Sequence, residues 1–168
     1  MTTESRAELT EAERDEGAMY LLKRFPDGIP SPRVFEELIT ANGFRGQEHV
    51  RRQGATLVYC HLRRGWRALI GQEPLETLGA RQNYLFMGAS GSGKTFLIEI
   101  LERIARVPVI VEDLNQYSDT GYVGETVSTI MSRLYQKANR RRGIAAIGIV
   151  MLDEFDKQIG RASCRERV

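Results

Sequence analysis

The sequence predicts an α/β fold in which helices flank a parallel sheet. Three apolar runs carry this prediction, because each has the composition of a strand buried on both faces: 84–87, 108–112 and 144–156. Segments whose apolar residues have helical spacing follow the first two runs. They contain Phe96, Leu97, Ile100, Leu101 and Ile104 after the first run, and Val127, Ile130, Met131, Leu134, Tyr135 and Ala138 after the second. Strands that alternate with helices are typical of parallel sheets, since a parallel pair needs a long crossover connection.

The composition is that of one soluble globular domain, with 168 residues, 42% hydrophobic and 27% charged. No apolar run is long enough to cross a membrane, and the N-terminus lacks a signal-peptide core, so the sequence predicts a cytoplasmic location. Cys60 and Cys164 lie far apart and predict free thiols, with neither a zinc site nor a disulfide framework. The net charge of +2 is too small to predict nucleic-acid binding, and we interpret the arginine runs at 51–52 and 140–142 as solvated helix ends.

Helices are also predicted before the first strand. Residues 5–24 have helix-forming composition and end near "FPDGIPSP", where prolines and a glycine indicate a linker. Ser31 is the expected N-cap of a short helix that stops at Asn42-Gly43. A further helix is expected at 47–65, and a connection at 66–82.

"GASGSGKT" matches the phosphate-binding pattern G-x-x-x-x-G-K-[ST]. Glycines let backbone N–H groups turn toward phosphates, and the N-terminus of the following helix adds a positive dipole. Lys94 is expected to contact the β- and γ-phosphates of ATP, and Thr95 to ligate Mg²⁺. The candidate nucleotide-binding residues of the motif are Gly88, Ala89, Ser90, Gly91, Ser92, Gly93, Lys94 and Thr95.

The third apolar run ends in two acids, which is the Walker B pattern. Asp153 is expected to hold Mg²⁺, directly or through water, and Glu154 to orient and deprotonate the attacking water. A lone Asp-Glu pair is a weak signal, but downstream of a phosphate-binding loop it becomes strong. The catalytic candidates are therefore Glu154 and Lys94, and the metal candidates are Thr95 and Asp153.

"DTGYVGE" places Tyr122 and Val123 between Gly121 and Gly124, after the second strand and before a predicted helix. One interpretation is a β-turn with a buried aromatic contact. The other is an exposed aromatic-aliphatic pair on a glycine hinge, suited to transient contact with polypeptide chains. The residues alone leave both open.

The combination of "GASGSGKT", "GYVGE" and "IVMLDEFDK", preceded by "GFRGQEHVRR", resembles the AAA+ ATPase module of the ClpX family over about residues 31–157. The resemblance implies a P-loop NTPase with the AAA+ large subdomain, ATP and Mg²⁺ as cofactors, and assembly into a homo-hexamer. It implies that Tyr122 and Val123 grip protein substrates in the central pore. A peptidase partner is left open. The related HslU family shares "GYVG" but inserts a long domain before Walker B, so ClpX is the closer resemblance.

Two departures from the family pattern concern the N-terminal half. "GFRGQE" aligns with the adenine-contacting turn, where the family usually has an aliphatic residue in place of Arg45. Phe44 and the Arg45 plane are expected to stack on the base, unless the base pocket is altered. Residues 1–30 contain no cysteine and have no counterpart of the family's zinc-binding module. We expect them to form a helical tail or linker.

The third departure concerns the C-terminus. The resemblance places a fourth strand, a sensor residue, an arginine finger and a small helical domain beyond residue 158, so we expect 31–158 to be a large subdomain that is incomplete at its C-terminus. Residues 159–168 are basic, lack an apolar period and resemble an adapter-derived, non-native tail; an ordinary basic tail is the alternative. We expect the isolated chain to be poorly stable, to bind nucleotide weakly and to hydrolyse it negligibly.

Together, these expectations predict that the chain is the ATP-binding and ATP-hydrolysing module of a protein unfoldase. The unfoldase would thread its substrates through the pore of a hexamer. One alternative is a nucleic-acid motor or clamp loader of the same superfamily, with the arginine runs on phosphates. Another is a nucleotide-binding module that does not hydrolyse ATP. The presence of Glu154 argues against that last alternative, because a pure binder needs no catalytic base.

Overall fold

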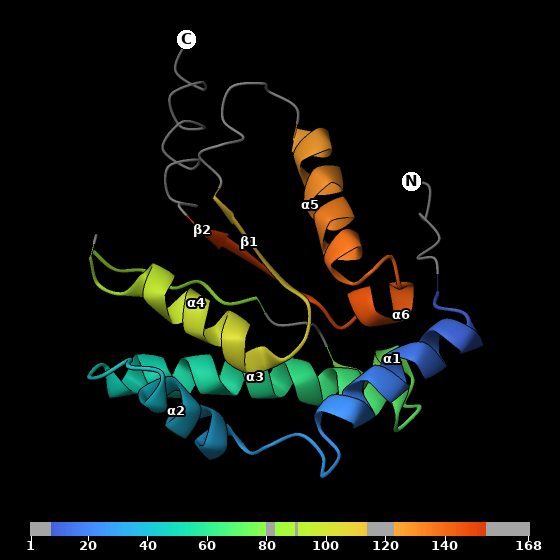
Figure 1. Cartoon of the computed structure of the whole chain (residues 1–168), viewed down its shortest axis with the longest axis horizontal. Coiled ribbons are helices and arrows are strands. Elements are labelled where there is room, and N and C mark those ends of the chain that lie inside the picture. Colours follow the sequence, from blue (N-terminus) through green and yellow to red (C-terminus); the bar gives the residue numbers. More distant parts are fainter. Residues whose placement is uncertain (1–7, 80–82, 90, 114–122, 154–168) are drawn as a thin grey trace.

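The computed structural model describes residues 8–79, 83–89, 91–113 and 123–153. Figure 1 shows the order of the helices and strands in these ranges: α1 (Glu11–Arg24), α2 (Pro32–Ala41), α3 (Glu48–Leu69), the short 3-10 helix η1 (Leu75–Leu78), α4 (Lys94–Ala105), β1 (Val109–Asp113), α5 (Val123–Lys137), α6 (Arg142–Ala145) and β2 (Ile149–Asp153). The expected helices at 31–43 and 47–65 correspond to α2 and α3. Among the described residues, no helix is long and apolar enough to cross a membrane.

The two described strands form a parallel pair, with Val109 opposite Ile149 and Asp113 opposite Asp153. Successive side chains of a strand point to opposite faces of a sheet. Val109, Ile149 and Met151 accordingly pack with residues of α4 on one face, whereas Ile110 packs with α5 on the other (Figure 1). The predicted α/β fold, with a parallel sheet flanked by helices, is confirmed for this part of the chain.

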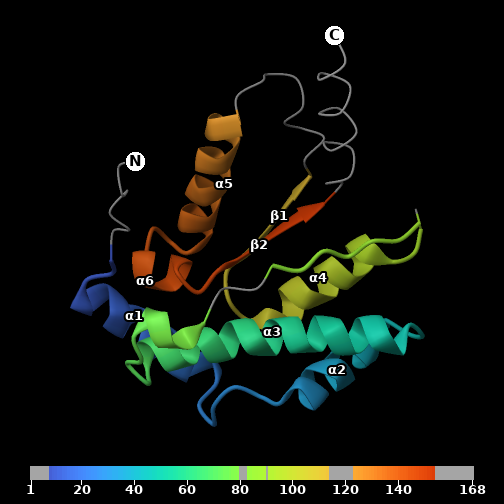
Figure 2. The ribbon, with the colours of Figure 1, turned by 180° about the vertical axis from the view of Figure 1, so that it is seen from behind.

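The main hydrophobic core lies between α4, the sheet and a layer formed by α1, α2 and α3. Figure 2 shows α3 running along the base of the molecule below α4. The apolar positions with helical spacing supply most of this core, since they share one face of each helix. Its most deeply buried side chains are Leu21, Phe35, Ile39, Val58, Leu62, Leu97, Ile100, Leu101 and Val109.

Helix α1 starts later than the sequence pattern predicted, at Glu11, because Thr10 caps it there. The Thr10 hydroxyl accepts from the Glu13 backbone N–H at 3.3 Å, and the Thr10 backbone N–H donates to the Glu13 carboxylate at 2.9 Å. That backbone hydrogen bond is the main reason that the pKa of Glu13 lies below its ordinary value. Ser31 is the N-cap of α2, as predicted, but its side chain makes no capping hydrogen bond.

The expected buried strand at Tyr84–Met87 is wrong. The structure assigns no strand to residues 83–89, and Leu85 and Met87 are 65% and 85% exposed. Only Phe86 of this run packs against the main core. A strand requires a neighbour that pairs with its N–H and C=O groups, and neither described strand pairs with this run. The apolar composition predicted burial correctly only for the one side chain that reaches the core.

The expected strand at 144–156 is shorter in the structure, where β2 covers Ile149–Asp153 within the described residues. Residues 142–145 form the short helix α6, and the Gly148 N–H donates to the Ala145 carbonyl at 2.9 Å. The Ile149 N–H then donates to the Pro108 carbonyl, also at 2.9 Å, and starts the pairing with β1. An apolar run does not reveal by itself where a turn ends and a strand begins.

Helix α1 packs directly against α6 (Figure 1). A Cβ on Gly143 would lie 1.8 Å from the Glu13 carbonyl oxygen, so only glycine permits this approach. Arg141 donates to Glu16 at 2.5 Å, and Arg142 to Glu13 at 3.1 Å. Leu21 and Phe25 of the N-terminal segment are buried in the main core. Helix α1 is therefore part of the packed structure.

Candidate functional site

The loop between residue 88 and α4 depends on three glycines. Gly91 and Gly93 have φ angles of +75° and +88°, in the left-handed region that favours glycine. A Cβ on Gly88 would lie 2.8 Å from the Ser92 hydroxyl oxygen, which is too close for a real side chain. Ser90 lies outside the described residues. The backbone of this loop thus takes a conformation that other residues at these positions would strain.

Lys94 is the first residue of α4 and folds back over the loop. Its Nζ donates to the carbonyl oxygens of Gly88 and Ala89, at 2.7 and 3.0 Å. Gly93 caps α4 without a side-chain hydrogen bond, so no side chain of the cap competes for the first N–H groups of the helix. An ammonium group and a helix N-terminus together favour an anion at this loop.

Thr95 and Asp153 are brought together from two distant motifs. The Thr95 hydroxyl donates to Asp153 Oδ2 at 2.9 Å, although the residues are 58 positions apart in the sequence. Asp153 ends β2 beside Asp113, which ends β1, so the acid stands at the carboxyl edge of the parallel pair. Ligands of α/β sheets bind at this edge. Glu154, the expected water-activating residue, lies outside the described residues.

Oxygen donors at this position fit a magnesium ion. Mg²⁺ in phosphate-binding proteins keeps several waters and takes only one or two protein ligands, together with phosphate oxygens. The Thr95 hydroxyl and the Asp153 carboxylate match this donor set. In the described ranges, no group of three or more His, Cys, Asp or Glu side chains could hold a metal ion by itself.

The turn before α3 contacts both the phosphate-binding loop and the first turn of α4. Phe44 is 5% exposed and stacks on Phe96 of α4, with ring centroids 6.2 Å apart. A Cβ on Gly93 would lie 3.3 Å from the Phe44 ring. Gln47 Nε2 donates to the Ser92 carbonyl at 3.0 Å. Gln47 is not among the residues predicted from the sequence, although the resemblance of "GFRGQE" to a base-contacting turn is a signal for it.

The expected base contacts of Phe44 and Arg45 stay predictions. Phe44, Gln47, Val50 and Phe86 belong to the lining of a small cavity of about 40 Å³ beside Lys94. Arg45 is exposed next to this turn. The cavity adjoins the phosphate-binding loop. We therefore expect the base of a nucleotide whose phosphates lie in the loop to bind next to this cavity.

The expected pore loop is only partly described. Gly121 and Tyr122 lie outside the described residues, and Val123 and Gly124 are the first two residues of α5. The predicted apolar stripe of this helix is confirmed at Ile130, Leu134 and Ala138, which are buried, whereas Met131 and Tyr135 are exposed. The sequence pattern predicts a helix immediately after the "GYVG" motif; α5 instead begins within the motif, at Val123. The role of the loop stays a prediction.

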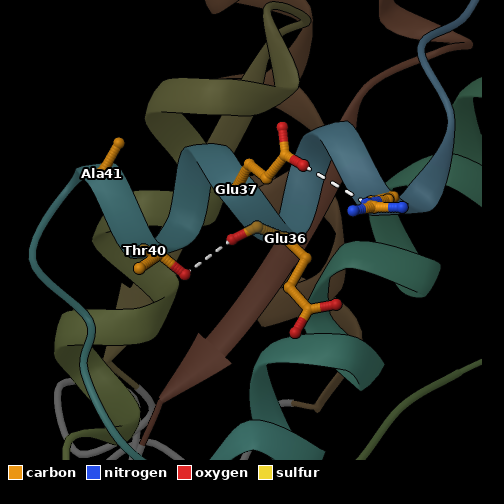
Figure 3. A pocket seen from close by; sticks show the side chains of 5 residues that line it. Glu36, Glu37, Thr40 and Ala41 are labelled. Atoms are coloured by element: carbon orange, nitrogen blue, oxygen red, sulfur yellow. Dashed lines mark hydrogen bonds and ion pairs between the residues drawn. The ribbon is translucent and has the colours of Figure 1, made fainter.

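A larger cavity of about 450 Å³ lies away from these motifs, along the outer side of α2 (Figure 3). Its lining includes Glu36 and Glu37, both labelled in Figure 3, and Arg33, whose Nε lies 3.5 Å from the Glu37 carboxylate. The Glu36 carboxylate is in turn paired with Arg51 and Arg52 of α3. Two carboxylates make this cavity a poor site for phosphates, so it is separate from the candidate nucleotide site.

Comparisons with known proteins agree with this geometry. The family model described as "ATPase family associated with various cellular activities (AAA)" matches residues 84–167. The "ATP-dependent Clp protease ATP-binding subunit ClpX" of Treponema denticola is 36% identical over 131 residues, which are 77% of this chain and 30% of that protein. The proteins of the same name from Borrelia duttonii and Borrelia recurrentis are each 32% identical over 132 residues, 79% of this chain and 30% of theirs.

The chain thus spans 30% of the length of these curated relatives. The family model begins at Tyr84 and includes both the phosphate-binding loop and Asp153. The resemblance to ClpX that the three motifs indicated is confirmed by the relatives, and the chain belongs to the AAA family of ATPases.

Proposed function

We propose that this chain is the ATP-binding and ATP-hydrolysing module of a protein unfoldase. The observation that carries the proposal is the hydrogen bond between Thr95 and Asp153, which joins the two motifs that an ATPase needs at one point. The names of the relatives, each an ATP-binding subunit of an ATP-dependent protease, support the same class of function.

Each residue of the site has a defined task in this proposal. Lys94 exchanges its hydrogen bonds with Gly88 and Ala89 for bonds to the β- and γ-phosphates of ATP. Thr95 and Asp153 hold Mg²⁺, which neutralises charge that develops on the phosphates. Glu154 accepts a proton from the attacking water. Phe44 and Arg45 contact the base.

The GYVG segment is the proposed site of contact with substrate. Tyr122 and Val123 grip an unfolded polypeptide inside the central pore of a homo-hexamer, and ATP hydrolysis moves the loop along the pore axis. The position of the segment supports this task, because α5 begins within it and packs on the strand next to Asp153. The relatives carry the name of a Clp protease subunit, so we propose a peptidase as the partner that receives the unfolded chains.

Both arginine runs that could serve a nucleic-acid motor are engaged within the chain. Arg141 and Arg142 pair with glutamates of α1, and Arg51 and Arg52 pair with Glu36 of α2. Side chains that already pair with carboxylates lose those partners if they bind phosphates. These ion pairs favour a protein substrate over nucleic acid.

Stimulation of ATP hydrolysis tests this function in the full-length protein. We expect an unfolded or loosely folded protein substrate to raise the hydrolysis rate, and a stably folded substrate to lose its structure only when ATP is hydrolysed. Single-stranded and duplex DNA serve as matched additives, and the salt dependence of any binding is recorded. Stimulation by DNA with no unfolding of any protein substrate would contradict the proposal.

Gly93→Ala is expected to weaken ATP binding by the full-length protein about tenfold, because its φ of +88° lies in the left-handed region, which costs an alanine about 1–2 kcal/mol. A Cβ at this position would also lie 3.3 Å from the Phe44 ring. Gly28→Ala, at φ +90° and outside the loop, introduces the same backbone strain and is the matched control. Titration with a fluorescent ATP analogue measures both affinities. Equal weakening by the two variants would show that the loop conformation is not the cause.

A further inference from the structure

A buried ion pair joins β1 to α5. Glu112 is 5% exposed and is the only buried charged residue in the part of the chain that the structure describes. Its Oε2 accepts from Arg133 Nη1 at 2.5 Å, and the Arg133 side chain is 48% exposed. A carboxylate out of water is costly unless a partner compensates its charge. Arg133 thus compensates the charge of the buried Glu112 carboxylate. The pair also fixes which part of α5 faces which part of β1.

Glu112 occupies the strand position just before the edge of the candidate nucleotide site. It stands opposite Leu152, and the next pair in the register is Asp113 with Asp153. Because side chains alternate along a strand, Glu112 points to the face opposite that of Asp113. The same short stretch of sheet therefore carries Asp153, bonded to Thr95, on one face and the ion pair with α5 on the other.

Among the side chains that the structure describes, residues of the C-terminal half of α5 pack on this strand. Ile130 and Leu134 form a small cluster with Ile110 of β1, separate from the main core. Arg133 lies on the same side of the helix, since residues three and four apart are neighbours on a helix surface. Apolar contacts are not directional, so these contacts do not by themselves fix the position of the helix along the strand. A hydrogen-bonded ion pair has a defined geometry and fixes that position.

The ion pair anchors a helix that begins within the GYVG segment. Helix α5 begins at Val123, directly after Tyr122, and both residues belong to the proposed substrate-contacting segment. We propose, building on the function proposed above, that the Glu112–Arg133 ion pair is a positioning element that transmits movement of the strand ends at the nucleotide site to the pore loop. The helix acts as a rigid arm, and the ion pair is its attachment to the sheet.

Arg133→Gln in the full-length protein is the main test. It leaves the buried Glu112 carboxylate without this partner, so the double variant with Glu112→Gln, which has no buried charge at this position, shows whether any loss comes from misfolding. Two quantities are measured: substrate protein unfolded per ATP hydrolysed, and the change in hydrogen exchange of residues 123–137 when ATP is added. We expect the hydrolysis rate to stay within about twofold of wild type and unfolding per ATP to fall about fivefold or more, within the range found for directly coupled residues. The ATP-dependent change in exchange should disappear.

Three further variants separate a positioning role from a merely structural one. Glu112→Gln should have the same effect as Arg133→Gln, and the double variant should be no worse than either, because the two residues act as a unit. Arg133→Lys keeps the charge and should retain much of the coupling. Lys137→Gln removes a second ion pair of α5, with Glu102 of α4, whose side chains are 46% and 38% exposed. This matched control should leave both quantities unchanged.

The outcomes distinguish this proposal from the proposed function. If wild-type protein hydrolyses ATP but unfolds no substrate, the unfoldase function fails, and the exchange measurement on 123–137 still decides whether the pair couples the two regions. If Arg133→Gln keeps the wild-type exchange response, or if Lys137→Gln abolishes it equally, the ion pair is not the coupling element.

Discussion

Asp153→Asn and Glu154→Gln in the full-length protein are each expected to lower the rate of ATP hydrolysis by about 10²–10³-fold, the loss typical when a group that acts on the reacting atoms is removed. The physical reasons differ. Asp153 supplies the charge that holds Mg²⁺ beside Thr95, to which it is bonded at 2.9 Å. Glu154 supplies the base for the attacking water.

The two variants are therefore expected to separate in ATP binding. Glu154→Gln should bind ATP as tightly as wild type and retain it, because the phosphate and metal contacts are intact. Asp153→Asn should bind ATP more weakly in the presence of Mg²⁺. Glu99→Gln, at an exposed position of α4, is the control for loss of a carboxylate on the same helix as Thr95. An Asp153→Asn protein with more than about a tenth of wild-type hydrolysis would contradict this assignment.

Tyr122→Ala is expected to slow protein unfolding strongly while ATP hydrolysis continues. The nucleotide site is built from the loop at 88–95 and from β2, so a side chain between β1 and α5 is not required for hydrolysis. The grip on a polypeptide depends on the aromatic ring, because aromatic anchors carry a large share of the energy in protein contacts. Loss of the ring should reduce the unfolding rate about tenfold or more, which corresponds to ~1.4 kcal/mol of binding.

Unfolding of a fluorescent substrate protein, measured beside phosphate release in the same samples, checks this expectation. Tyr122→Phe should retain most of the activity, since it keeps the ring. Tyr135→Ala removes an exposed tyrosine from α5. It is the matched control, because it also removes an aromatic ring but lies outside the GYVG segment. Equal unfolding by Tyr122→Ala and wild type would mean that the substrate is held elsewhere.

The sequence predicted those parts of the site that depend on local chemistry. The motif at 88–95 located the start of α4, because a glycine-rich loop followed by Lys94 and Thr95 has one well-known geometry. The apolar run before Asp153 predicted a strand that presents this acid at its carboxyl end, and the structure places it next to Thr95. Helical periodicity likewise predicted the buried residues Leu97, Ile100, Leu101 and Ile104 of α4, whereas Phe96 of the same series is 44% exposed.

The sequence could not predict features that depend on a distant partner. Tyr84–Met87 has the composition of a strand, but strand formation requires a neighbouring strand, and none of the described residues supplies one. The ion pair of Glu112 with Arg133 joins two elements whose charges look ordinary in the sequence. The approach of α1 to α6 depends on Gly143, and a lone glycine carries no signal of what will pack against it.

The effect of Mg²⁺ on ATP affinity tests the central claim most directly, namely that Thr95 and Asp153 together form a metal–nucleotide site. Titration calorimetry of the full-length protein gives the dissociation constant for ATP with Mg²⁺ and with a chelator. We expect Mg²⁺ to tighten binding in wild type and to have little effect in Asp153→Asn or Thr95→Ala. Equal tightening by Mg²⁺ in all three proteins would show that the metal is held elsewhere and would contradict the account.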